Sequence, residues 1–75
     1  MATTSVSLTA LQREIGEAVA RGRERSGLTQ QGLARKLGTR QANISRIERG
    51  LQNLSLDLLV RLNDTLGLHL HIAIK

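Results

Sequence analysis

The sequence is most informative at first for what it lacks. Its 75 residues contain no cysteine, proline, phenylalanine, tyrosine or tryptophan. The missing cysteines exclude disulfides and thiolate zinc sites, and two histidines alone cannot make a closed four-ligand metal site. A domain of this size buries only about 60% of its unfolded surface, and small scaffolds are usually stabilised by disulfides, a metal or association. Because the core must be aliphatic and the first two devices are excluded, we expect a homodimer.

Residues typical of membrane spans, export signals and catalytic sites are also missing. The longest apolar run is far too short to cross a membrane, and no signal-peptide pattern opens the chain. There is no glycine-rich phosphate loop, and Glu14, Glu17 and Glu24 have no acid or base partner for catalysis. We therefore expect a single cytoplasmic domain that is not an enzyme and uses no metal, cofactor or small-molecule ligand.

Positive charge is concentrated in the middle of the chain. Eleven basic against six acidic residues give a formal net charge of +5, and nine of the basic residues are arginine. Eight of the eleven basic residues, against two acidic ones, lie between Arg21 and Arg49. The planar fork of arginine suits phosphates and base edges, so this segment favours a polyanionic partner such as nucleic acid. A merely solvated basic surface is the alternative.

Apolar residues at three- and four-residue steps predict four helices. They run from Leu8 to Gly27, from Thr29 to Gly38, from about Arg40 to Gly50 and from Ser55 to Gly67. The expected inner face of the first helix is Leu8, Leu11, Ile15 and Val19. Serine and threonine suit the N-caps, and a glycine is the natural stop at each C-terminal end. The predicted fold class is all-α: a flexible arm over 1–7, a compact helical domain over 8–67, and a different segment over 68–75.

The end of the chain changes to a period of two. Leu68, Leu70, Ile72 and Ile74 alternate with His69, His71, Ala73 and Lys75, which is the pattern of a strand with one apolar face. No other segment reads as a strand, and a single strand cannot satisfy its own backbone groups. We therefore expect the four apolar residues to form a dimer interface by strand pairing. A frayed tail, or a fifth helix with accidental alternation, is the alternative.

Residues 30–49 have the spacing of a helix-turn-helix. Ala34 is small where the two helices cross, and Gly38 follows at the turn, where a positive φ is needed. Ile44 and Ile47 then hold the second helix of this motif, which is the third expected helix of the chain, against the core. An ordinary helical hairpin of unrelated function is the alternative at this point.

The run from Leu28 to Gly50 reads LTQQGLARKLGTRQANISRIERG. It resembles the XRE or Cro/CI family of helix-turn-helix DNA-binding proteins, and the resemblance covers about Val19 to Gly67. The resemblance implies a bundle of four or five helices that binds double-stranded DNA. It also implies an ion pair between Arg23 and Glu48, which would join the first helix to the end of the third.

Three features depart from the usual family pattern. Arg40 stands where a serine usually precedes the glutamine that opens the third helix, so Thr39 is expected to cap instead. Leu54 stands where a proline is common, and the chain ends in an apparent strand rather than a fifth helix. This strand, and the start of the third helix (RQANIS, residues 40–45), resemble the HipB-type antitoxins.

The resemblance implies that the third helix lies in the major groove and reads base edges with its N-terminal residues. The candidate base contacts are Arg40, Gln41, Ala42, Ser45 and Arg46. Glutamine can bond to adenine N6 and N7, arginine to guanine O6 and N7, and alanine can touch a thymine methyl. Candidate phosphate contacts flank this face, at the positive end of the second helix and beyond it: Thr29, Gln30, Gln31, Asn43, Arg49 and Asn53.

Three functions remain open from the sequence. The first is a dimeric, sequence-specific repressor that is also the antitoxin of a Hip-type toxin–antitoxin module, autoregulates its operon and binds a HipA-like kinase toxin. The second is a stand-alone or phage-type regulator. The third is a protein-interaction module, against which the basic charge and the polar face of the third helix argue.

Overall fold

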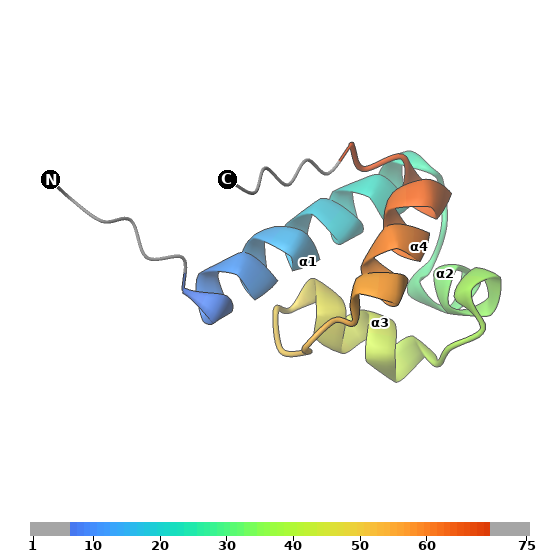
Figure 1. Cartoon of the computed structure of the whole chain (residues 1–75). Coiled ribbons are helices and arrows are strands. Elements are labelled where there is room, and N and C mark those ends of the chain that lie inside the picture. The colour runs from blue at the N-terminus through green and yellow to red at the C-terminus, as the bar shows by residue number, and fades with distance from the viewer. Residues whose placement is uncertain (1–6, 70–75) are drawn as a thin grey trace, which may run out of the picture.

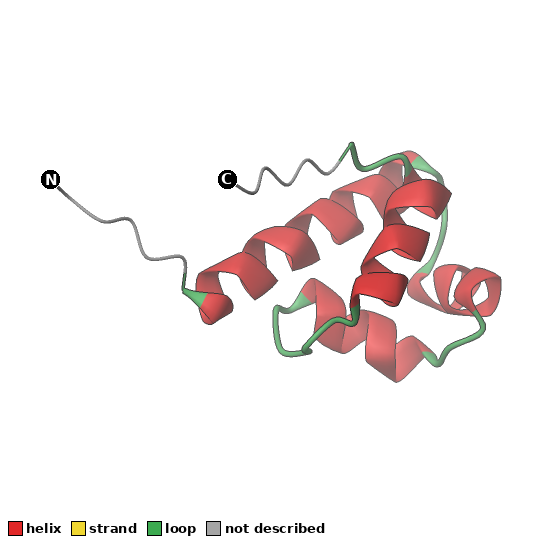
Figure 2. Cartoon of the chain, viewed as in Figure 1, coloured by secondary structure: helices red, strands yellow, loops and turns green. Residues whose placement is uncertain are grey.

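The computed structural model describes residues 7–69, which form four helices and no strand. The helices are α1 (Leu8–Arg25), α2 (Gln30–Leu37), α3 (Gln41–Glu48) and α4 (Leu56–Leu66). α3 crosses the middle of α1, α4 also packs against α1, and α2 packs on α3. The first turns of α1 extend beyond the other helices (Figure 1). All regular structure in this part of the chain is helical (Figure 2), which confirms the expected all-α fold.

Side-chain caps begin three of the helices. Ser7, Thr29 and Ser55 each accept a hydrogen bond from the backbone amide three residues on, at 3.2, 2.9 and 3.1 Å. Such caps satisfy amides that have no partner inside the helix, and each contributes about 1 kcal/mol. Gly38 is the C-cap of α2, and its φ of 68° is left-handed and therefore favours glycine.

The start of α3 differs from the sequence prediction. Its N-cap is Arg40, which makes no side-chain capping bond. Thr39 does not cap in its place, because its hydroxyl accepts a hydrogen bond of 2.8 Å from the Asn43 side chain. The prediction of a Thr39 cap was therefore wrong: the helix begins one residue later than that cap requires.

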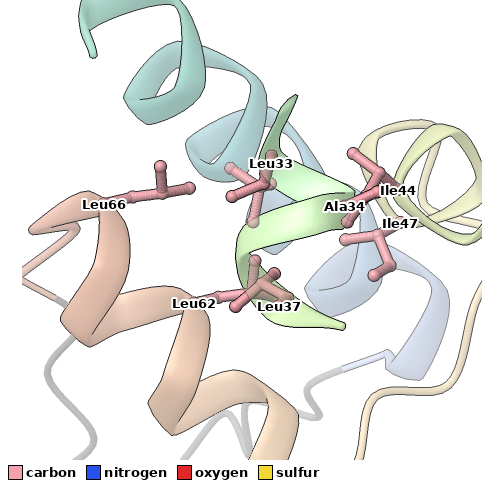
Figure 3. Close-up of a cluster of buried hydrophobic side chains, with 8 residues drawn as sticks. Leu33, Ala34, Leu37, Ile44, Ile47, Leu62 and Leu66 are labelled. Carbon is pink, nitrogen blue, oxygen red and sulfur yellow. The ribbon is translucent and has the colours of Figure 1, made fainter. Parts of the chain in front are cut away.

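Aliphatic side chains from all four helices meet in one core. Its buried members are Val19, Leu33, Ala34, Leu37, Ile44, Ile47, Leu62 and Leu66. Figure 3 shows the members from α2, α3 and α4 pointing toward a shared centre. Burying each large aliphatic side chain is worth about 1.5–3 kcal/mol, so these residues hold α2 and α3 in a fixed relation.

Only the C-terminal half of the predicted inner face of α1 belongs to this core. Val19 is fully buried and Ile15 packs against the cluster. In contrast, Leu8 is 62% exposed and Leu11 is 42% exposed. The first turns of α1 extend past the other helices, so apolar spacing alone overestimated the buried length.

The predicted C-terminal strand lies mostly outside the described residues, as do Leu70, Ile72 and Ile74 of the expected dimer interface. Leu68 and His69 are described, and neither is in a strand. Leu68 packs against the core of its own chain, beside Gly22. Among the described helices, none is long and apolar enough to cross a membrane.

Candidate nucleic-acid interface

Helices α2 and α3 form a helix-turn-helix with a short turn between Leu37 and Gln41. Ala34 of α2 is only 2% exposed and lies against the isoleucines of α3 (Figure 3). Ile44 and Ile47 are buried, so they fix which side of α3 faces the core. The opposite side of α3 is thereby turned to solvent.

The predicted base-contacting residues share this outward side of α3. Arg40, Gln41, Ala42 and Arg46 are exposed, and Ser45 is partly exposed. They offer arginine donors, an amide, a hydroxyl and a methyl group, which are the groups that distinguish base pairs in the major groove. We call these five residues the α3 outer face.

A nearly buried ion pair joins α1 to the C-terminal end of α3. Nε of Arg23 donates to Oε2 of Glu48 at 2.6 Å, and Nη2 donates to Oε1 at 3.1 Å. The third donor, Nη1, bonds to the Leu28 carbonyl oxygen at 2.9 Å, just before α2. The two charged side chains are 16% and 7% exposed. Arg23 therefore joins the C-terminal part of α1 to the segment just before α2 and to the C-terminal end of α3.

The charge of Arg23 is secured by its partner. The hydrogen bond to Glu48 raises the pKa of Arg23 above its usual value, and the charges of Glu48 and Glu24 act in the same direction. Burial opposes this change without reversing it. Removing one partner of such a bidentate pair leaves the other charge partly buried and unpaired.

Gln30, predicted to contact phosphate, lies between the ion pair and the α3 outer face. Its Nε2 donates to Oε1 of Glu48 at 3.0 Å. Its Oε1 accepts a hydrogen bond of 3.3 Å from Nε2 of Gln41. This bridge cannot be read from the sequence, because it depends on side chains from α2 and from both ends of α3 meeting in space.

Three of the other predicted phosphate contacts make a side-chain hydrogen bond within the chain. Thr29 caps α2, Asn43 donates to Thr39, and Asn53 accepts a hydrogen bond of 2.5 Å from Gln12 of α1. Gln31 and Arg49 are exposed. Gln31 and Arg49 can donate directly to a phosphate. The hydrogen-bonded side chains also keep a donor, because Thr29 and Asn53 use an acceptor in their internal bond and Asn43 uses one of its two amide hydrogens.

Two positive features lie on and beside the α3 outer face. No carboxylate occurs in the first turn of α2 or α3, so no acidic side chain of either helix's own first turn offsets the positive end of its dipole. Arg35, Arg40, Arg46 and Arg49 are exposed on these helices and their caps. This arrangement suits a surface that approaches a phosphate backbone.

A family model described as helix-turn-helix matches residues 19–72, which is most of the chain. The chain belongs to this XRE-type helix-turn-helix family. The family is one of DNA-binding regulators, so the helix-turn-helix makes the chain a DNA-binding regulator of this type. A search of curated proteins found no match.

Proposed function

We propose that this regulator binds double-stranded DNA in a sequence-specific way and acts as a transcriptional repressor. The observation that carries the proposal is the α3 outer face: polar and basic side chains on a short helix whose other side is buried in the core. A recognition helix must be held rigidly, since base discrimination depends on hydrogen-bond geometry. The Arg23–Glu48 pair and the buried isoleucines supply that rigidity.

In this proposal α3 enters the major groove with its N-terminal end leading. Gln41 pairs with adenine N6 and N7, and Arg40 or Arg46 pairs with guanine O6 and N7. Ala42 contacts a thymine methyl, and Ser45 bonds to a neighbouring base. Contacts from the flanking residues to phosphates set affinity and register rather than sequence. They come from Thr29, Gln30, Gln31, Asn43, Arg49 and Asn53.

A salt titration against duplex DNA tests the DNA-binding part. We expect the logarithm of the binding constant to fall linearly with the logarithm of salt concentration, because bound phosphates release counterions. Binding to a selected duplex should also exceed binding to random duplex by about a thousandfold or more. A flat salt dependence would support a protein-interaction module instead. A steep slope without any preferred sequence would refute sequence-specific repression.

We further propose that the repressor is a homodimer paired through the segment after His69, with Leu70, Ile72 and Ile74 as its apolar face. Leu68, which the sequence pattern also assigned to this face, packs instead against the core of its own chain. A two-fold dimer places two recognition helices about 34–36 Å apart, one helical turn of DNA, and matches a palindromic site. The alternating pattern of the segment supports this pairing.

The narrower proposal is that the protein is the antitoxin of a Hip-type module, with a HipA-like kinase toxin as its second partner. Its support is the RQANIS start of α3 and the alternating C-terminal segment, both similar to HipB-type antitoxins. The test is co-expression with a kinase-like protein encoded beside it. A stable complex that binds the operator of the same genes supports the antitoxin role. The absence of such a neighbour supports a stand-alone or phage-type regulator.

A further inference from the structure

An apolar stripe runs along one side of α1 and is covered at one end only. Its members follow one another at three- and four-residue steps, which places them on one side of the helix: Leu8, Leu11, Ile15, Ala18 and Gly22. Gly22 is buried, and Ala18 and Ile15 are partly buried. Leu11 and Leu8 are 42% and 62% exposed, where α1 extends beyond the other helices (Figure 1).

Leu68 covers the buried end of this stripe. A β-carbon at Gly22 would lie 2.5 Å from Cδ2 of Leu68, so the leucine fills the place that the missing side chain leaves. Gly67 and His69, on either side of Leu68, have left-handed φ angles of 60° and 56°. The chain therefore turns where it meets α1, and its described part ends there, one residue before Leu70.

Only one direction along α1 continues the apolar surface from this point. Toward the C-terminal end of α1, Nη2 of Arg25 lies 3.7 Å from the place of the same β-carbon, and the helix ends at that arginine. Toward the N-terminal end, the other four members of the stripe follow over the whole length of the helix. An apolar segment that continues from Leu68 therefore finds its surface toward Leu8.

The next residues of the chain match this surface in pattern and in length. Leu70, Ile72 and Ile74 alternate with more polar or smaller residues, so an extended chain places the three apolar side chains on one side. From Leu70 to Ile74 such a chain spans about 13 Å. From Ala18 to Leu8 the helix rises about 15 Å.

We propose that residues 70–74 lie along the first turns of α1 in the same chain, with Leu70 beside Ala18 and Ile74 nearest Leu8. It is the same chain because Leu68, two residues earlier, already packs on its own α1. Residues 8–18 precede the part that the family model matches, so this surface is an addition to the helix-turn-helix. The backbone edge of the segment stays free to pair with a second copy.

Disulfide trapping in the full chain tests the inference, because the protein contains no cysteine of its own. Leu11→Cys is combined with Ile72→Cys or with Ile74→Cys, and oxidation is followed on a non-reducing gel and by peptide mass. We expect a disulfide within one chain, formed at least about tenfold faster than in the control. Arg13→Cys with the same partners is the matched control, since Arg13 is exposed and lies on the opposite side of α1.

Amide hydrogen exchange in the full chain gives a second readout that needs no cysteine. Ile72→Ser with Ile74→Ser should speed exchange in the first turns of α1 by about tenfold, because an uncovered helix end opens more readily. Leu56→Ser with Val60→Ser removes two exposed apolar side chains from α4 instead. That control should leave exchange in α1 unchanged.

The outcomes that overturn the inference are equal trapping rates for the Leu11 and Arg13 pairs, or unchanged exchange in the variant of Ile72 and Ile74. A disulfide that joins two chains places the segment on the helix of a second copy and overturns it as well. Neither measurement uses DNA, so a failure here is distinct from a failure of the proposed repressor function.

Discussion

Gly16 of α1 lies directly against the carbonyl oxygen of Ile47 in α3. A β-carbon at Gly16 would overlap that oxygen and would lie 2.8 Å from the carbonyl oxygen of Glu48. The two helices therefore touch backbone to backbone at this crossing. This close approach brings the last turn of α3 within reach of Arg23, which lies about two turns further along α1. The ion pair therefore depends on the absence of a side chain at residue 16.

The first prediction concerns this crossing. Alanine has a helix propensity about 1 kcal/mol better than glycine, yet Gly16→Ala should destabilise the protein by about 1–3 kcal/mol, because the added methyl meets backbone that cannot move aside. Urea unfolding followed by circular dichroism measures the change. Greater stability of the variant would show that the helices can separate at no cost.

Gly22→Ala is the matched control for this prediction. Gly22 is also buried in α1, but its β-carbon would meet Cδ2 of Leu68 at 2.5 Å and Cβ of Leu66 at 3.2 Å. The nearest of these atoms is the end of a side chain that can rotate. The cost should therefore be smaller than at Gly16, at equal helix propensity.

The second prediction concerns the ion pair between Arg23 and Glu48. Either single change to methionine should cost about 3–5 kcal/mol, because it leaves an unpaired charge in a nearly buried place. The double change should cost less than the sum of the two, and urea unfolding of all four proteins gives the coupling energy. Additive effects would mean that the two charges do not stabilise each other.

The exposed pair of Glu17 and Arg21 provides the comparison. Its atoms are 3.7 Å apart, and the side chains are 58% and 62% exposed. The same substitutions there should show a coupling of no more than about 0.5 kcal/mol. A similar coupling at both places would argue that burial is not what makes the first pair strong.

The third prediction concerns phosphate binding by Arg49. This residue is the exposed C-cap of α3. Arg49→Ala should weaken binding to all duplex sequences about equally and reduce the salt slope by about one. Arg21→Ala removes the same charge from α1 and should leave the slope nearly unchanged. Equal effects of the two variants would show that net charge, rather than a contact at Arg49, governs affinity.

The sequence was sufficient for the helices and for the helix-turn-helix because those features rest on local patterns. Thr29 and Ser55 cap the helices that the spacing predicted, and Gly38 has the left-handed backbone that the turn requires. Ala34, Ile44 and Ile47 are buried as their spacing indicated. Periodicity and capping act within a few residues, so they can be read without a tertiary structure.

The features that the sequence did not reveal depend on contacts between distant segments. Gly16 reads as a weakness of α1 until the backbone of α3 is placed against it. Gln30 reads as a phosphate ligand until Glu48 and Gln41 are brought to its two ends. The exposure of Leu8 and Leu11 follows from how far α1 extends past its neighbours, which periodicity does not encode.

The last prediction concerns the dimer. Leu68 packs beside Gly22 within its own chain, so a truncation that tests the interface should keep it and remove only residues 70–75. We expect the full chain to sediment as a dimer and the truncated chain as a folded monomer. The monomer should bind a palindromic site much more weakly, because each monomer must then bind its half-site independently.

An interface on α4 is the alternative to one formed by residues 70–75, and a second variant distinguishes the two. Leu56 and Val60 lie one turn apart on this helix and are 77% and 57% exposed. Replacing both with serine should leave the dimer intact if residues 70–75 form it, because side chains outside the interface do not contribute to the stability of the dimer. If the serine variant sediments as a monomer while the truncated chain remains a dimer, the interface lies on α4. The two recognition helices would then be related by a two-fold axis through α4, and the half-site spacing of the operator would change with it.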